Sequence, residues 1–308
     1  MLSSIKKKTK TLFSGILTAV NLISGIISIV SGLASLKVQI QGCGLQGIFS
    51  LAVGMLIFII CQVIYKKFLY KGNMMLYSRG IGSISACYDD IFSIAEKDTT
   101  AKKFVVIPVN TTFDMIIDEA GAKVTVPLIS PSSLHGQWIK KRNDYALTLD
   151  DINNQINESL QLQNEKPEKV IFRDKKPRGN LKEYSIGTIA SVEGTHNTIF
   201  LLAALSSFDE NNCAHATEDD INRVIKKIVH YCDIHGQQAP VYLPVMGTGP
   251  ARTHLKKFDA FKLIYNAILL SAEEVNEAYT IVIYTSDEKD IPLNKIKDMV
   301  KKCDLRKD

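Results

Sequence analysis

The sequence predicts an α/β protein in two parts: a hairpin of two membrane-spanning helices, followed by a mixed β-sheet sandwiched between helices. The first 65 residues contain five charges, all lysine, whereas the other 64 charges of the 308-residue chain lie in residues 66–308. Beyond residue 72, aliphatic runs of strand length alternate with longer stretches of helical periodicity, a pattern typical of a sheet covered by helices. We therefore expect a domain boundary between residues 1–71 and residues 72–308.

Two uncharged runs near the N-terminus predict the membrane spans. Residues 11–36 and residues 38–65 contain no charged side chain, and about 20 apolar residues suffice to cross the hydrocarbon core of a bilayer. A cleaved signal peptide would have a shorter apolar run with no second run directly after it. A buried hairpin of a soluble protein would rarely hold a single charge over this length. We expect spans at about residues 11–36 and 44–65.

The lysines that flank the two spans predict their orientation. Four lysines precede the first span and three follow the second closely, whereas only Lys37 lies between them. Because basic residues are retained on the cytoplasmic side of a membrane, both termini are expected in the cytoplasm. The sequence thus predicts a multi-pass protein of the cell membrane.

One face of the first predicted span carries small and polar residues. They recur at spacings of three and four: Ser14, Thr18, Asn21, Gly25, Ser28, Gly32 and Ser35. Small residues let helices approach closely in a membrane, and polar ones find partners across the contact. This stripe fits packing within one hairpin, and it also fits the assembly of hairpins from several chains around a polar path.

Residues 72–308 predict the mixed sheet and its helices. The expected strands are residues 81–87, 104–109, 184–192, 198–205, 240–245 and 280–284. The expected helices are residues 149–163, 218–235, 254–272 and 292–302. Thr217 is a suitable N-cap for the second helix, residues 193–196 suggest a hairpin turn, and the Lys-, Pro- and Glu-rich segment 164–182 is expected to be an exposed loop. Residues 66–308 hold 32 basic and 32 acidic side chains, which argues against binding of nucleic acid.

A glycine-containing segment follows the predicted strand 240–245. It reads Met246-Gly247-Thr248-Gly249-Pro250-Ala251-Arg252 and leads toward a predicted helix. In such a turn, backbone N–H groups and the positive end of the helix dipole favour an anion, and Arg252 adds charged donors. Neither a Walker A loop nor a GxGxxG fingerprint is present. The segment therefore predicts a phosphate site of another type.

A second candidate lies at the end of the buried strand 104–109. Asn110 follows this strand, and ligands of open α/β sheets bind beyond the carboxyl ends of the strands. Its amide is suited to a ribose or phosphate oxygen; alternatively, it caps a turn. The histidines show no metal-binding spacing, so we expect no metal, no cofactor and no catalytic residue.

Three segments together resemble a macro domain, the fold that binds ADP-ribose. In the order typical of that family, they are Tyr88-Asp89-Asp90-Ile91-Phe92, Ile107-Pro108-Val109-Asn110 and Pro244-Val245-Met246-Gly247-Thr248-Gly249. With two spans in front, the chain resembles the macro-domain transmembrane effectors of type II Thoeris anti-phage systems. The resemblance implies an α/β/α macro-like domain with a mixed sheet over residues 72–308.

The resemblance also implies a function. A TIR-domain partner would make an ADP-ribose derivative, a histidine conjugate of ADP-ribose, and this small molecule alone would couple the two proteins. The macro domain would bind the signal, the chain would form homo-oligomers, and the spans would disrupt the lipid membrane and kill or arrest the cell. A membrane-tethered ADP-ribosyl hydrolase and an anchored scaffold with a vestigial pocket are the alternatives.

The resemblance finally implies roles for individual residues. Asp90 would accept from the adenine amino group, with Ile91 packed nearby, and Asn110 would face the distal ribose. Phe113 replaces the second Asn typical of hydrolases and offers a stacking face, and the segment from Ser130 to Gln137 replaces the family's glycine run; both departures argue against hydrolysis. The expected ligand-binding residues are Asp90, Ile91, Asn110, Thr111, Phe113, His135, Gly136, Met246, Gly247, Thr248, Gly249 and Arg252.

Overall fold

The computed structural model describes residues 73–117, 128–209, 213–249, 253–271 and 276–304, together with Gly54. The chain divides into two units, residues 1–67 and 68–308, and the fold below belongs to the second. The predicted membrane spans lie outside the described residues, apart from Gly54. None of the helices in the described part of the chain is long and apolar enough to cross a membrane.

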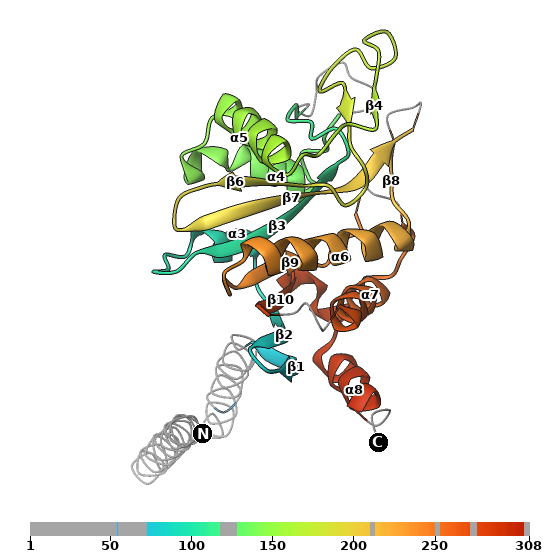
Figure 1. The fold of residues 1–308 in the computed structure, drawn as a ribbon. Helices are drawn as coiled ribbons and strands as arrows, with labels where there is room; N and C mark the ends of the chain where they lie inside the picture. Colours follow the sequence, from blue (N-terminus) through green and yellow to red (C-terminus); the bar gives the residue numbers. More distant parts are fainter. Residues whose placement is uncertain are drawn as a thin grey trace, which may run out of the picture. The chain divides into compact units, whose positions relative to one another are not determined.

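A mixed sheet forms the centre of the second unit, as predicted. Its main path has the order β1-β2-β10-β9-β3-β7-β6, with β8 paired to β7 (Figure 1). The five central strands run parallel to one another, whereas β1 and β6 are antiparallel to their neighbours. The strands are β1 (Met74–Arg79), β2 (Gly82–Tyr88), β3 (Lys103–Asn110), β6 (Ile189–Glu193), β7 (Thr198–Phe208), β8 (Ala214–His215), β9 (Val241–Pro244) and β10 (Ala278–Ile283).

Helices cover both faces of this sheet, which makes the unit an α/β/α sandwich. Figure 1 shows α4 and α5 in green on one side and α6 and α7 in orange on the other. Buried residues of α3, α4 and α5 belong to one core, and those of α6, α7 and α8 belong to a second core. The helices are α3 (Ile91–Glu96), α4 (Leu134–Lys140), α5 (Leu149–Leu162), α6 (Glu218–His235), α7 (Lys257–Leu270) and α8 (Leu293–Asp304).

The alternation of side chains along β3 explains why there are two cores. Phe104 and Val106 pack in the core with α6 and α7, whereas Val105, Ile107 and Val109 pack in the core with α4 and α5. Successive side chains of a strand point to opposite faces, so a strand buried on both faces must be apolar throughout. The continuous aliphatic run of this strand therefore places it in the middle of the sheet.

Local sequence signals set the bounds of several elements. Thr217 and Asp220 form a complete capping box, and α6 spans the predicted residues 218–235. The hairpin predicted at residues 193–196 is confirmed, since it joins the antiparallel strands β6 and β7. The strand expected from residue 184 begins only at Ile189, because Gly187 before it has a φ of +91°, outside the range of strands.

The expected exposed loop at residues 164–182 needs a correction. Two short strands pair here, β4 (Lys169–Val170) within the segment and β5 (Lys182–Glu183) at its C-terminal end. Most of its side chains are exposed, but Lys176 is buried with 5 % of its surface accessible. The smaller elements that complete the fold are the 3-10 helices η1 (Arg142–Tyr145) and η2 (Thr285–Lys289).

Candidate functional site

A cavity of about 540 Å³ lies at the carboxyl ends of the parallel strands. The sequence predicted a ligand site at this edge of the sheet, because ligands of open α/β sheets bind beyond the carboxyl ends of the strands. Several strand ends and the loops that follow them contribute to its walls: Asp89 and Asp90 after β2, Asn110 in β3, Ser206 and Phe208 in β7, residues 246–249 after β9, and Tyr284 after β10.

Eight of the twelve expected site residues line this cavity: Asp90, Ile91, Asn110, His135, Met246, Gly247, Thr248 and Gly249. Thr111, Phe113 and Gly136 are not among the lining residues, and Arg252 lies outside the described residues. The sequence did not single out the end of β7, where Leu205, Ser206 and Phe208 contribute to the wall. These residues continue a buried aliphatic strand without a motif, so only the pairing of β7 with β3 reveals them.

The side chain of Asp90 is held in place by a hydrogen bond to the N-terminus of α3. Its Oδ1 accepts a hydrogen bond of 3.1 Å from the backbone N–H of Phe92, so Asp90 is the N-cap of this short helix. The backbone N–H of Asp90 in turn donates to Asp89 Oδ1 over 2.8 Å. The cap holds a carboxylate at the β2 side of the cavity in one orientation.

The turn after β9 contains two glycines, and a side chain would have a different effect at each of them. Gly247 has a φ of +91°, and a Cβ there would lie 2.5 Å from Ile221 Cδ1, so the fold itself requires glycine. The carbonyl of Gly247 accepts a hydrogen bond of 2.6 Å from the Thr253 hydroxyl. A Cβ on Gly249 would meet no atom of the described residues within 4 Å. The space beside Gly249 is therefore open, as the approach of a ligand would require.

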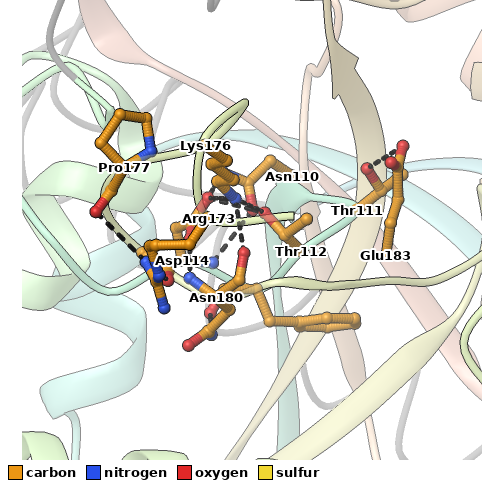
Figure 2. A network of polar contacts seen from close by, with 11 residues as sticks. Asn110, Thr111, Thr112, Asp114, Arg173, Lys176, Pro177, Asn180 and Glu183 are labelled. Atoms are coloured by element: carbon orange, nitrogen blue, oxygen red, sulfur yellow. Dashed lines mark hydrogen bonds and ion pairs between the residues drawn. The ribbon is translucent and has the colours of Figure 1, made fainter. Parts of the chain in front are cut away.

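Asn110 lines the cavity, but its amide is bound to the turn that follows β3. Figure 2 shows the polar network around it. Its Nδ2 donates to Asp114 Oδ2 over 3.0 Å, and its Oδ1 accepts from the backbone N–H of Asp114 over 3.0 Å. Thr112 donates from its hydroxyl to the same Asp114 oxygen over 2.6 Å. The structure thus shows Asn110 in the turn-capping role that was the alternative to ligand contact.

A buried ion pair joins this turn to the loop between β4 and β5. Lys176 Nζ lies 2.7 Å from Asp114 Oδ2, and their side chains are 6 % and 0 % exposed. The ammonium also donates to Thr112 Oγ1 over 2.7 Å and to the carbonyl of Asn180 over 2.8 Å, so it has an acceptor for each of its three protons. Burial lowers the pKa of Lys176, although Asp114 counteracts that shift.

The same loop approaches Asp114 from a second direction. The backbone N–H of Asn180 donates to Asp114 Oδ1 over 2.6 Å (Figure 2). Asn180 Nδ2 also donates to the carbonyl of Phe113 over 2.7 Å. Gly179 has a φ of +78°, and a Cβ there would lie 2.2 Å from Asp114 Oδ1. The loop therefore closes against the end of β3 only because residue 179 is glycine.

Phe113 lies in the core instead of at the cavity wall. Its ring is 1 % exposed and packs edge-on against Tyr184, with the ring centroids 5.7 Å apart. The residue has a φ of +50° within the turn that Asn110 begins. The ring that was expected to stack on a ligand is thus buried beside Tyr184 in this structure.

His135 is a lining residue with an unusual environment. Only 6 % of its surface is exposed, and its Nε2 is buried without a hydrogen-bond partner among the described residues. Burial lowers the pKa of His135 to about 3, so the imidazole is neutral at physiological pH. Gly136 after it packs against the backbone of Ser130, where a Cβ would lie 2.2 Å from the carbonyl oxygen.

The charge at the cavity wall limits its chemistry. Three carboxylates line it, those of Asp89, Asp90 and Asp287, and within the described residues no lysine or arginine does. Asp287 is neutralised by Lys257, whose Nζ lies 2.6 Å from Asp287 Oδ1. Among the described residues no cluster of His, Cys, Asp or Glu is arranged to hold a metal ion. Among the described lining residues, an anion would therefore find backbone N–H groups and hydroxyls as donors but no charged side chain.

Two solved structures of a bacterial macrodomain are similar to this chain. A mutant of the Oceanobacillus iheyensis macrodomain is 12 % identical, covering 75 % of this chain and 95 % of that chain with a TM-score of 0.47. The Oceanobacillus iheyensis macrodomain with ADP is 12 % identical, covering 75 % of this chain and 98 % of that chain with a TM-score of 0.43. No curated protein matches the chain significantly.

One family model covers more than half of the chain. The model described as "Thoeris protein ThsA, Macro domain" matches residues 84–284, which extend from β2 to the end of β10. This range contains every described element that lines the cavity except η2. The chain therefore belongs to the Thoeris ThsA macro-domain family.

Proposed function

We propose that this chain is the sensor and effector of a Thoeris anti-phage system. Its macro domain binds an ADP-ribose derivative, a histidine conjugate of ADP-ribose made by a TIR-domain partner, and the small molecule is the link between the two proteins. The cavity at the carboxyl ends of the strands carries this proposal. Its volume of about 540 Å³ lies within the range of roughly 300–1,000 Å³ usual for pockets that bind small molecules.

The order of the strands suggests how such a ligand lies. Asp90 follows β2, the glycine turn follows β9, and Asn110 ends β3, in the strand order β2-β10-β9-β3-β7. A dinucleotide-like ligand with its diphosphate on the central turn then places its base near Asp90. Its second ribose and the group attached to that ribose lie on the side of β3 and β7.

The predicted membrane spans supply the effector step of this proposal. Ligand binding promotes homo-oligomers, the spans at about residues 11–36 and 44–65 assemble, and the cell membrane loses its barrier. Both termini and the macro domain are cytoplasmic in this proposal, as the lysine pattern predicts. The support for this step is the sequence of residues 1–71 together with the family of residues 84–284.

A tethered ADP-ribosyl hydrolase is the competing function. A hydrolase needs a side chain free to act on the distal ribose, and the amide of Asn110 is engaged by Asp114 at both its ends. Phe113, which replaces the second Asn of hydrolases, is buried against Tyr184. These contacts favour binding without turnover.

Calorimetry of the full chain in detergent tests the proposal. We expect the histidine conjugate of ADP-ribose to bind at one site per chain and to be recovered unchanged, as judged by mass spectrometry of the ligand after incubation. Asp90→Asn should weaken binding at least severalfold, because it removes a charge-assisted acceptor. Asp150→Asn is the matched control, since Asp150 is exposed on α5 and does not line the cavity.

Two results of these experiments would contradict the proposed sensor function. Failure of both ADP-ribose and its conjugate to bind would exclude the sensor function. Binding followed by chemical conversion of the ligand would instead show that the chain acts as a hydrolase.

A further inference from the structure

His135 has no evident structural reason to be a histidine. Its Nε2 is buried and lacks a hydrogen-bond partner among the described residues. Nearly all buried polar atoms of folded proteins have such a partner, and an exception calls for an explanation. An apolar ring of similar size would avoid the loss of hydration that this nitrogen suffers. His135 is also one of the residues that line the cavity, so a bound ligand provides an explanation.

The backbone around His135 is held firmly. Ser133 is the N-cap of α4: its hydroxyl accepts from the backbone N–H of Gly136 over 3.0 Å and donates to the carbonyl of Ser130 over 2.7 Å. Gln137 Nε2 donates to the carbonyl of Ser132 over 2.9 Å. These bonds fix the backbone that carries His135 before any ligand arrives, which is the arrangement expected of a group that selects a ligand.

The place of α4 in the fold assigns His135 to one part of the cavity. The helix contacts β3, and Trp138 packs against Phe200 of β7 with ring centroids 5.5 Å apart. Asp90 follows β2, on the other side of the glycine turn after β9. His135 therefore lies on the side that, under the proposed function, receives the part of the ligand beyond the diphosphate.

We propose that His135 determines ligand specificity: a ring nitrogen hydrogen-bonds an uncharged polar group, a hydroxyl or a ring N–H, that the ligand carries beyond its diphosphate. This inference rests on the proposed function and names the residue that reads the terminal part of the signal. Because burial keeps the imidazole neutral, it supplies direction and shape instead of charge. The serines that surround it, Ser130, Ser132 and Ser133, are uncharged as well and also line the cavity.

The test compares two ligands that share the base and the diphosphate. ADP-ribose carries a second ribose, and ADP ends at its phosphates. We expect the full chain in detergent to bind ADP-ribose more tightly than ADP. In His135→Phe this preference should fall at least tenfold, the usual effect of leaving a buried polar group without its partner. Affinity for ADP should stay within about twofold of the wild type.

Three further variants separate this role from a structural one. Asp90→Asn should weaken both ligands equally, because the base is common to them. His135→Gln retains a neutral hydrogen-bonding group and should recover part of the preference. His235→Phe is the matched control, since His235 lies at the end of α6 and does not line the cavity. The melting temperature of His135→Phe should equal or exceed that of the wild type, because the substitution removes an unpaired polar atom.

The outcomes distinguish the inference from the function on which it rests. If the wild type prefers ADP-ribose and His135→Phe keeps the same preference, the inference is wrong and the sensor function stands. If His135→Phe loses affinity for both ligands together with thermal stability, His135 is structural and the inference is again wrong. If the wild type binds neither ADP-ribose nor its conjugate, the function fails and the inference fails with it.

Discussion

At the residue scale, the buried pair Asp114–Lys176 connects three parts of the chain: the hydroxyl of Thr112 in the turn after β3, the carbonyl of Asn180, and the amide of Asn110, which Asp114 binds directly. Each of these contacts is buried or partly buried, and a charge without a partner is strongly unfavourable in such a place. The pair therefore explains why Asn110 keeps one orientation at the cavity wall.

Replacing Lys176 by Met should lower the free energy of unfolding by about 3–5 kcal/mol, because it leaves the Asp114 carboxylate buried and unpaired. The single tryptophan of the chain, Trp138, is fully buried, so its fluorescence during urea unfolding of the full chain reports this unit. Lys175→Met is the matched control, because Lys175 is exposed; it should change stability by no more than about 0.5 kcal/mol. A Lys176→Met protein as stable as this control would contradict the role assigned to the pair.

The low pKa of His135 predicts a pH dependence of stability. Its pKa in the folded protein is about 3, against 6.5 for an ordinary histidine, so below pH 6.5 the unfolded chain binds a proton that the folded chain does not. Stability should therefore fall as the pH decreases from 6.5 towards 3, by up to about 1.4 kcal/mol per pH unit from this group. All other titrating groups are the same in the wild type and in His135→Phe, so the difference in stability between the two proteins isolates the contribution of His135.

The pH measurement accordingly compares these two proteins. Urea unfolding at pH 7, 6 and 5 should show the advantage of His135→Phe over the wild type growing as the pH decreases. A constant difference across these pH values would show that the imidazole is protonated in the folded state as readily as in the unfolded one.

Local sequence motifs singled out residues that line the cavity, but they gave no sign of the polar network beside it. Asp90, Gly247 and Gly249 belong to short motifs next to predicted strands, and all three line the cavity. Asp114 and Lys176 are 62 positions apart. The segment around Lys176 is rich in Lys, Pro and Glu, a composition that predicts an exposed side chain at this position. Its burial depends on Gly179 and on the tertiary fold, which no local pattern reveals.

At the element scale, prediction succeeded where an apolar pattern and a cap coincide. The bounds of α6 follow from the capping box at Thr217 and from buried residues at helical spacing. Helix α4 was not expected, because its seven residues include Gly136 and are too few for a clear periodicity. The structure makes it a helix through the Ser133 cap and the burial of Trp138 in the core.

The turn after β9 yields a prediction that separates folding from binding. Gly247→Ala should destabilise the protein by about 1–2 kcal/mol or more, because alanine would adopt a φ of +91° and would clash with Ile221. Gly249→Val should leave stability nearly unchanged, since the space beside it is open, and should abolish binding of ADP-ribose. Trp138 fluorescence and calorimetry on the full chain measure the two effects. Normal affinity in a folded Gly249→Val protein would place the diphosphate elsewhere.

At the scale of the whole molecule, the proposed function requires the two parts of the chain to be coupled. The lysine pattern around the spans predicts that a reporter fused after Asp308 is cytoplasmic and that the chain remains in membranes after a carbonate wash. An exported reporter would invert the predicted topology and would separate the macro domain from a cytoplasmic signal.

Ligand-driven assembly is the last prediction. A ligand shifts an equilibrium between separate and assembled chains only by binding the assembled state more tightly. If the stripe that contains Gly25 and Gly32 forms the contact, then Gly25→Leu with Gly32→Leu should separate the helices and prevent assembly. Mass photometry in detergent should show larger oligomers of the wild type when the histidine conjugate of ADP-ribose is added. Dye-loaded vesicles that contain the wild-type protein should leak when the conjugate is added. The double variant should bind the conjugate normally, because both substitutions lie outside the macro domain, yet neither assemble nor cause leakage. A wild type that keeps one size and leaves vesicles intact at saturating ligand would refute the effector step, while the binding function would stand.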